Sequence, residues 1–124
     1  MPVRTRTLTL LVASALTLVS CGGSEAPVRE RTGEFTVTLD DYLIRPQEVR
    51  VPKGQRLTLT VVNRGRLAHA LRIRGATKNV LAFTAIRPGE SKTRQFSPAP
   101  GIYTMYCALA NHEELGMYGT LTVG

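Results

Sequence analysis

The chain has 124 residues, enough for one domain, and its 16 Lys and Arg against 9 Asp and Glu give a formal net charge of +7. Such an excess favours acidic partners or anionic surfaces but carries no information about the fold. The composition argues against nucleic acid as a partner, because no aromatic side chains alternate with the basic ones to stack on bases.

Residues 1–20 have the pattern of an export signal. Arg4 and Arg6 form a positive start, and residues 8–19 are an apolar run too short to span a bilayer. The segment ends in Leu18-Val19-Ser20-Cys21, which resembles a bacterial lipobox, where the cysteine is lipidated and becomes the new N-terminus. An ordinary signal peptide followed by a chance cysteine is the alternative. We expect an exported lipoprotein, anchored to a membrane of the cell envelope through Cys21 and facing the periplasm or the outside. Cleavage would remove two arginines and lower the net charge from +7 to +5.

Residues 21–33 are predicted to be a flexible tether, because they are polar, contain glycine and show no periodicity. In an exported protein, two cysteines are usually read as a disulfide. We disfavour a bond between Cys21 and Cys107, because the lipobox uses the sulfur of Cys21. Residues 34–124 would then form the folded domain.

From Glu34 onward, apolar and polar residues alternate, which is the pattern of half-buried strands. Asp40-Asp41-Tyr42 interrupts the first run, and Pro52-Lys53-Gly54 is a turn signal between later ones. Residues 78–83 fit either a short helix or an edge strand. The alternating runs cover residues 35–39, 49–51, 57–61, 71–73, 91–96, 102–106 and 120–123.

Seven or eight short strands with almost no helix predict an all-β fold, an antiparallel Greek-key β-sandwich or barrel. An immunoglobulin domain is the obvious competitor. It is disfavoured because the chain has no tryptophan and residues 34–124 contain a single cysteine.

One stretch near the C-terminus carries a thiol, an imidazole and a thioether at intervals of five residues: Cys107, His112 and Met117. An α-helix would rotate them apart, since five residues turn a helix by about 140° beyond a full turn. A strand would send them to alternate faces, because five is an odd step. The three side chains can converge only if the segment is a loop curled around a point.

The fourth partner would be His69, the other histidine of the chain, which lies between two predicted strands. One thiolate and two imidazoles with a weak axial thioether form the arrangement of a mononuclear type 1, or blue, copper centre. The expected metal ligands are therefore His69, Cys107, His112 and Met117. A rigid sandwich would limit their movement between Cu(I) and Cu(II), which suits electron transfer.

Each of these residues also has a simpler interpretation, as a core methionine, a loop histidine or a buried thiol. Other chemistries fit less well. A structural zinc site usually has paired Cys or His ligands, and haem attachment needs Cys-x-x-Cys-His. A binuclear copper site would need a second cysteine in the loop. A Cys–His nucleophile would need an orienting third residue, and none is evident.

These residues make the domain similar to the cupredoxins, the small blue copper proteins. The similarity runs from about Glu34 to Val123 and is strongest in Gly101-Ile102-Tyr103-Thr104-Met105-Tyr106-Cys107-x₄-His112-x₄-Met117-Tyr118-Gly119. It implies a β-sandwich with copper at one end, ligated by the four residues above. It also implies one-electron transfer without catalysis by the domain alone, and no small-molecule substrate.

Two departures from the family pattern concern the surroundings of the metal. Many members have asparagine or serine after the first histidine, and this chain has Ala70. The side-chain support of the ligand loops is therefore missing at that position, although the backbone amide remains. The loop also reads Leu109-Ala110-Asn111 where close relatives often have Pro-Gly before the histidine. Neither change removes a ligand.

The exposed edge of His112 is the expected route for electrons, with Leu109, Ala110 and Leu115 as an apolar docking patch around it. Arg64 and Arg66 would lie on the rim, where they could steer a redox partner with an acidic face. The alternative function is copper storage, or delivery to a partner such as an oxidase. The small number of methionines in residues 21–124 favours electron transfer.

Overall fold

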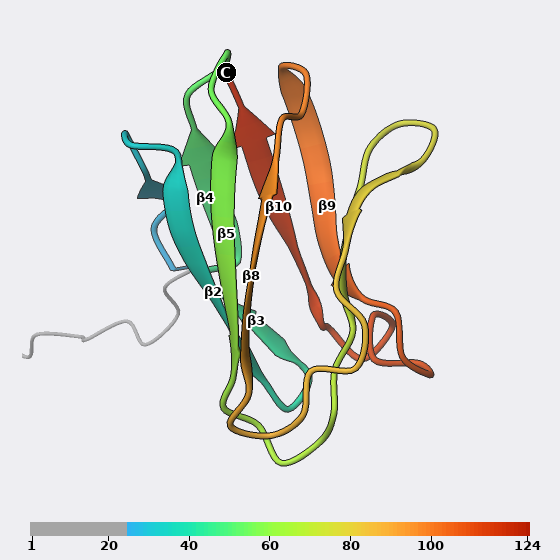
Figure 1. Ribbon diagram of the computed structural model, residues 1–124. Coiled ribbons are helices and arrows are strands. Elements are labelled where there is room, and N and C mark those ends of the chain that lie inside the picture. The colour runs from blue at the N-terminus through green and yellow to red at the C-terminus, as the bar shows by residue number, and fades with distance from the viewer. Residues whose placement is uncertain (1–24) are drawn as a thin grey trace, which may run out of the picture.

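The computed structural model describes residues 25–124, so the predicted signal peptide and Cys21 lie outside the described residues. Two β-sheets face each other as a sandwich (Figure 1). This confirms the predicted all-β sandwich, and the described residues contain no helix. The strands are β1 Val28–Arg29, β2 Glu34–Asp40, β3 Leu43–Arg45, β4 Glu48–Val51, β5 Leu57–Asn63, β6 Leu71–Arg74, β7 Asn79–Ala82, β8 Ser91–Phe96, β9 Gly101–Cys107 and β10 Tyr118–Val123.

Both sheets are mixed, whereas the sequence predicted antiparallel pairing. One sheet has six strands in the order β1-β4-β10-β9-β6-β7, and the other has four in the order β3-β2-β5-β8. Strand β2 pairs with β5 in parallel, and β4 pairs with both β1 and β10 in parallel. Alternation of side chains is common to both kinds of pairing when one face is solvated, so the hydrophobic pattern did not separate them.

Two strands were absent from the prediction. Strand β1 lies inside the predicted tether of residues 21–33 and pairs with β4, so residues 28–30 of that segment are bonded to the domain. Strand β3 forms a tight hairpin with β2 around Asp41-Tyr42. The open segment of residues 78–83 contains strand β7 at the edge of the larger sheet.

The core forms between the sheets because each strand turns every second side chain inward. Strand β5 shows this most clearly, since its buried residues are Leu57, Leu59, Val61 and Asn63. Met105, Met117 and Leu121, from the last part of the chain, also belong to this buried apolar core. Asn63 and His69 are the buried polar residues among those described.

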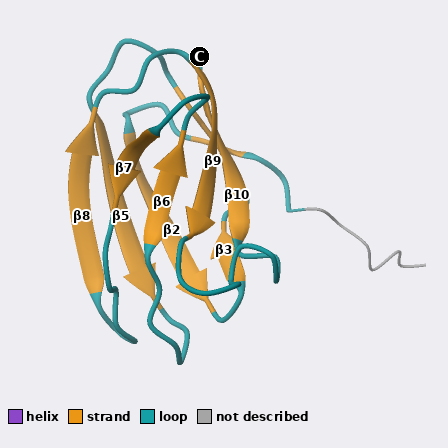
Figure 2. Cartoon of the chain, turned by 90° about the vertical axis from the view of Figure 1, so that its right-hand side faces the viewer, coloured by secondary structure: helices purple, strands orange, loops and turns teal. Residues whose placement is uncertain are grey.

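Three connections meet at one end of the sandwich, opposite the C-terminus: the β2–β3 turn, the β5–β6 loop and the β9–β10 loop (Figures 1 and 2). They carry Asp41, His69 and His112 respectively. A search of residues 25–124 for a helix long and apolar enough to cross a membrane finds none.

Candidate metal centre

Cys107 is the last residue of β9 and points into the sandwich, like Met105 two residues earlier. It is a free thiol and is 1% exposed. Strand β6 lies beside it, with Leu71 opposite Cys107 in the ladder. That pairing brings the Ala70 N–H to 3.5 Å from the Cys107 sulfur. The backbone amide of residue 70 therefore reaches the sulfur even though that residue has no polar side chain.

The segment after Cys107 curls as the five-residue spacing predicts. The Met117 N–H donates to the His112 carbonyl at 3.0 Å, and the Cys107 N–H donates to the Met117 carbonyl at 3.1 Å. Ala110 adopts a left-handed φ of 45° within the curl. These bonds return the chain to its starting point, so Met117 lies beside both Cys107 and His112, with its side chain fully buried in the core.

His69 comes from the β5–β6 loop and is fully buried. Its backbone forms an isolated bridge with Ile86, and the two residues exchange N–H···O bonds of 3.0 and 2.7 Å. These bonds fix the backbone of His69 against Ile86. The centroids of the two imidazoles lie 5.3 Å apart at 64°.

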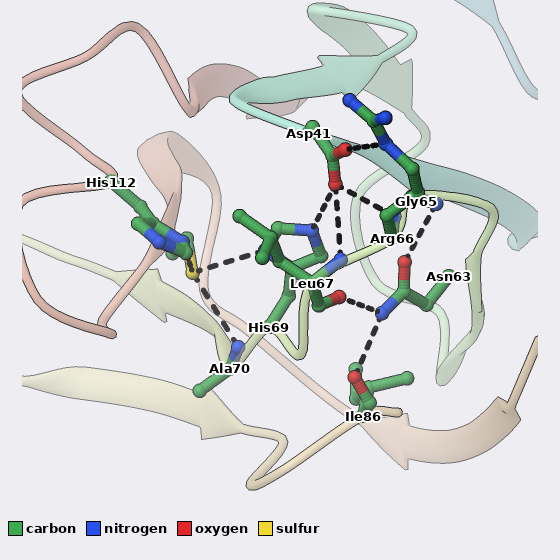
Figure 3. Close-up of polar contacts among 10 residues, drawn as sticks. Asp41, Asn63, Gly65, Arg66, Leu67, His69, Ala70, Ile86 and His112 are labelled. Atoms are coloured by element: carbon green, nitrogen blue, oxygen red, sulfur yellow. Dashed lines mark hydrogen bonds and ion pairs between the residues drawn. The ribbon is translucent and has the colours of Figure 1, made fainter. Parts of the chain in front are cut away.

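The potential ligand atoms of His69, Cys107 and His112 all lie within 4.8 Å of one another. Nδ1 of His112 is 3.5 Å from the Cys107 sulfur and Nδ1 of His69 is 3.9 Å from it (Figure 3). Metal–sulfur and metal–nitrogen bonds of about 2.3 and 2.0 Å, opened at about 110–130°, place sulfur and nitrogen about 3.5–3.9 Å apart. The three residues therefore fit a single ion, and burial of the thiol and of His69 shields it from water.

The electrostatics also suit a ligand. Burial lowers the pKa of His69, and the neighbouring His112 lowers it further, while Asp41 and Asp40 oppose the shift. The net effect keeps the imidazole neutral and its lone pair available at neutral pH. His112 is only partly buried, so it is the one of the three possible ligands whose ring has an edge toward solvent.

The β5–β6 loop is supported by polar groups that sequence reasoning missed (Figure 3). The buried Asn63 donates to the carbonyls of Leu67 and Ile86, each at 2.8 Å, and accepts from the Gly65 N–H at 2.9 Å. Asp41 accepts from the Arg66 and Leu67 amides at 2.8 and 3.2 Å. In the sequence both residues look like ordinary turn residues, and nothing there indicates that Asp41 reaches a loop 25 residues later.

The β9–β10 loop is attached differently. Glu113 pairs with Arg74 of β6 at 2.7 Å, and the Arg74 guanidinium lies 4.3 Å from the centre of the Tyr106 ring. Tyr42, at a left-handed φ of 64° in the β2–β3 turn, sets its ring edge-on to His112 with centroids 5.2 Å apart. The ion pair is partly exposed, so it contributes little to holding the β9–β10 loop.

The apolar residues expected around His112 do not all reach the surface. Leu115 is 53% exposed and Ala110 is exposed, but Leu109 packs partly against the core. Tyr42 adds an aromatic surface that was not predicted. Arg64 and Arg66 are both exposed on the β5–β6 loop, and Arg66 Nε lies 3.2 Å from a carboxylate oxygen of Asp41.

A sandwich with a Cys–His–His cluster at one end, and a methionine next to it in the chain's path, is the architecture of a cupredoxin-type protein. The sequence profile of the cupredoxin-like domain matches residues 9–123. The chain therefore belongs to the family of cupredoxin-like domains. A comparison with curated protein sequences finds no significant match.

Solved structures share the fold. Reduced auracyanin from the photosynthetic bacterium Roseiflexus castenholzii superposes with a TM-score of 0.70 at 24% identity, covering 77% of this chain and 99% of that one. Auracyanin A, a "blue" copper protein of Chloroflexus aurantiacus, gives 0.65 at 18% identity over 80% and 100% of the two chains. A multicopper oxidase gives 0.57 at 21% identity over 73% of this chain but 41% of its own.

Proposed function

We propose that this protein is a blue copper carrier of single electrons, with one mononuclear type 1 copper ion held by His69, Cys107, His112 and Met117. The observation that carries the proposal is the meeting of the Cys107 sulfur with one ring nitrogen each of His69 and His112, all within 4.8 Å of one another. Copper would supply the one-electron couple between Cu(I) and Cu(II). The likeness to a protein described as a "blue" copper protein supports this choice of metal.

The protein's own residues would keep the ligands still. Cys107 and His69 are anchored by backbone pairing with β6 and Ile86, and both are shielded from water. Little movement between the two oxidation states favours fast electron transfer. The partly exposed edge of His112 is then the point of entry and exit, with Tyr42 and Leu115 at the contact surface. The domain would act as a carrier and not as an enzyme, with a redox protein as its partner and no small-molecule substrate.

Copper reconstitution of the purified protein, followed by visible absorption and EPR, tests the proposal. We expect an intense thiolate-to-copper charge-transfer band that is lost in Cys107→Ser. Glu48→Gln, an exposed change on β4, is the matched control and should keep the band. A colourless protein that retains only zinc would refute the electron-carrier function.

Copper storage or delivery to an oxidase would use the same ligands, so release has to be measured separately. Because His69 and Cys107 are buried, we expect Cu(I) to stay bound through repeated cycles of oxidation and reduction. Rapid loss of Cu(I) to a soluble chelator during those cycles would favour delivery instead.

We further propose that the chain is exported and attached to the cell envelope through a lipid on Cys21, near the start of the segment that leads into β1. The support is the charge, length and Leu-x-Ser-Cys ending of residues 1–21. Intact-mass analysis of the protein from membranes should show the acyl chains, and Cys21→Ser should abolish them. An unmodified N-terminus in the wild type would contradict the anchor.

A further inference from the structure

The carboxylate of Asp41 lies between the β2–β3 turn and the loop that carries His69 (Figure 3). Its Oδ1 accepts from the Arg66 N–H at 2.8 Å and from the Leu67 N–H at 3.2 Å. Its Oδ2 accepts from Arg66 Nε at 3.2 Å. The side chain of Asp41 is 22% exposed, and the three bonds fix its carboxylate in one orientation.

Beyond these bonds, the carboxylate faces the ring of His69. Nε2 of His69 is buried and has no hydrogen-bond partner among the described residues, while Asp41 Oδ1 lies 3.8 Å from it. A neutral imidazole carries one proton, on one of its two nitrogens. If Nδ1 offers its lone pair to a metal beside Cys107, the proton must be on Nε2. A buried N–H without an acceptor is unfavourable, so the nearby carboxylate determines whether that tautomer is favoured.

We propose that Asp41 is the positioning residue of His69: its carboxylate attracts the Nε2 proton and thereby holds the ring with Nδ1 toward the Cys107 sulfur. The inference rests on the proposed metal site, and it assigns to the β2–β3 turn a role in that site. Metal-ligating histidines commonly direct their second nitrogen to a carboxylate or a carbonyl, which fixes the tautomer and raises ligand basicity.

A separate observation indicates that the approach of the turn to the loop is built into the chain. A Cβ atom on Gly65 would lie 2.5 Å from Asp41 Oδ1 and 2.9 Å from the Asp41 backbone nitrogen. Only glycine allows the two segments to approach this closely. Ala70 has no polar side chain with which to support the ligand loops. The contact of Asp41 with the β5–β6 loop supplies support of that kind from another element.

The test uses the metal-free protein and Zn²⁺ as the probe, because zinc takes the same His and Cys donors without redox chemistry. Asp41→Ala removes the carboxylate. Asp41→Asn keeps an oxygen for the Arg66 and Leu67 amides but loses the charge. Asp40→Asn is the matched control. It removes the same charge from the preceding residue, whose carboxylate pairs with the exposed Arg45.

In the wild type, ¹⁵N NMR of the imidazole nitrogens should show the His69 proton on Nε2. We expect Asp41→Ala to mix the two tautomers and to weaken Zn²⁺ binding by about 10–100-fold, the usual effect of losing such a partner. Asp41→Asn should fall between Asp41→Ala and the wild type. Asp40→Asn should lie closer to the wild type than Asp41→Asn does, because the charge of Asp40 acts on His69 more weakly than that of Asp41. If Asp41 served only to tie the loop, the Leu67 amide would exchange faster while the tautomer stayed the same.

An unchanged tautomer and Zn²⁺ affinity in Asp41→Ala would overturn the inference. If that variant does not fold, Asp41→Asn decides, and equality with Asp40→Asn in both measurements has the same meaning. The two proposals fail in distinguishable ways. A wild type that binds neither Zn²⁺ nor copper refutes the metal site, whereas the tautomer of the metal-free protein still tests Asp41.

Discussion

The two loops that supply the histidines are held in opposite ways. The β5–β6 loop is tied from within by the buried amide of Asn63 and by the carboxylate of Asp41, and its His69 is fully buried. The β9–β10 loop is held by backbone bonds at its ends and within it, and by a partly exposed ion pair between Arg74 and Glu113. Its His112 is partly exposed.

This difference separates two tasks that a carrier site must perform. A loop tied by the buried side chain of Asn63 and by Asp41 fixes one ligand and shields it from water. A loop held by its own backbone bonds and a partly exposed ion pair presents the other ligand to a partner, where some adjustment on contact is useful. The stability of the domain should therefore depend strongly on the first loop and weakly on the second.

The largest contrast is expected between Asn63→Ala and Glu113→Gln. Asn63→Ala removes three hydrogen bonds of a fully buried side chain. The Leu67 carbonyl loses its partner, whereas the Ile86 carbonyl keeps its bond from the His69 N–H and the Gly65 N–H keeps its bond to Leu39. The loss of three bonds should lower the free energy of unfolding by about 3 kcal/mol. Glu113→Gln breaks only an exposed ion pair, so we expect a change near the scatter of the measurement. Urea denaturation of the metal-free protein compares them. Equal losses would mean that the two loops are equally held.

Backbone packing gives a second contrast, between Gly65→Ala and Ala110→Gly. Gly65→Ala forces a methyl group against the backbone of Asp41, which should reduce stability by about 2 kcal/mol. Ala110 already adopts a left-handed φ of 45°. Glycine relieves that strain but adds entropy to the unfolded chain, so Ala110→Gly should change stability by less than about 1 kcal/mol. Thermal melts of both variants, without metal, would reveal the difference.

A smaller effect should appear with pH in the metal-free protein. Burial, followed by the neighbouring His112, lowers the pKa of His69 below its ordinary value of 6.5. The unfolded chain then binds the proton more readily than the folded one. The contribution of His69 to the free energy of unfolding is therefore fully present above pH 6.5. It is lost as the pH drops toward the pKa of the folded state, by at most about 1.4 kcal/mol per pH unit.

The control for this pH effect is His69→Gln, which cannot titrate at that position. Its stability should vary less with pH between 7.5 and 5.5 than that of the wild type. A wild-type profile as flat as that of the variant would show that the first loop does not respond to protonation of its histidine.

The smallest effect concerns the rim of the site and is measured with the copper-loaded protein. Arg64→Ala should slow reduction by hexacyanoferrate(II), which is anionic, by a few-fold at low salt, and the difference should vanish at high salt. Hexaammineruthenium(II), a cation, should show no such slowing. Arg66 is the weaker choice for this test, because its charge is partly offset by Asp41. Rates that ignore both charge and salt would remove the steering hypothesis.

Much of the architecture could be predicted because alternation of apolar residues is a local signal. Strand β8 was placed to the residue, and β9 and β10 within two residues of their ends. Strands β1 and β3 were missed because two or three residues are too few to show a period. The parallel pairs were missed because pairing depends on which strands meet in space.

The candidate site divides along the same line. Cys107, His112 and Met117 could be grouped from spacing alone, and His69 could be added because the chain offers no other imidazole. Asp41 and Asn63 could not be found this way. Asn63 bonds the Ile86 carbonyl 23 residues later, and Asp41 bonds the Arg66 amide 25 residues later. No pattern within five or ten residues records these two contacts.

The bond from the Cys107 N–H to the Met117 carbonyl continues the β9–β10 ladder and closes the loop at its neck. Residues 108–116 are therefore a hairpin excursion whose two ends are set by the sheet. Lengthening such an excursion is inexpensive, since each doubling adds only about 0.6 kcal/mol of closure entropy. Insertions or deletions in this loop could therefore change which partners the edge of His112 fits. The positions of Cys107 and Met117 would be kept by the β9–β10 ladder. The loop around His69, packed on Asp41 without room for a methyl group, has no such freedom to diversify.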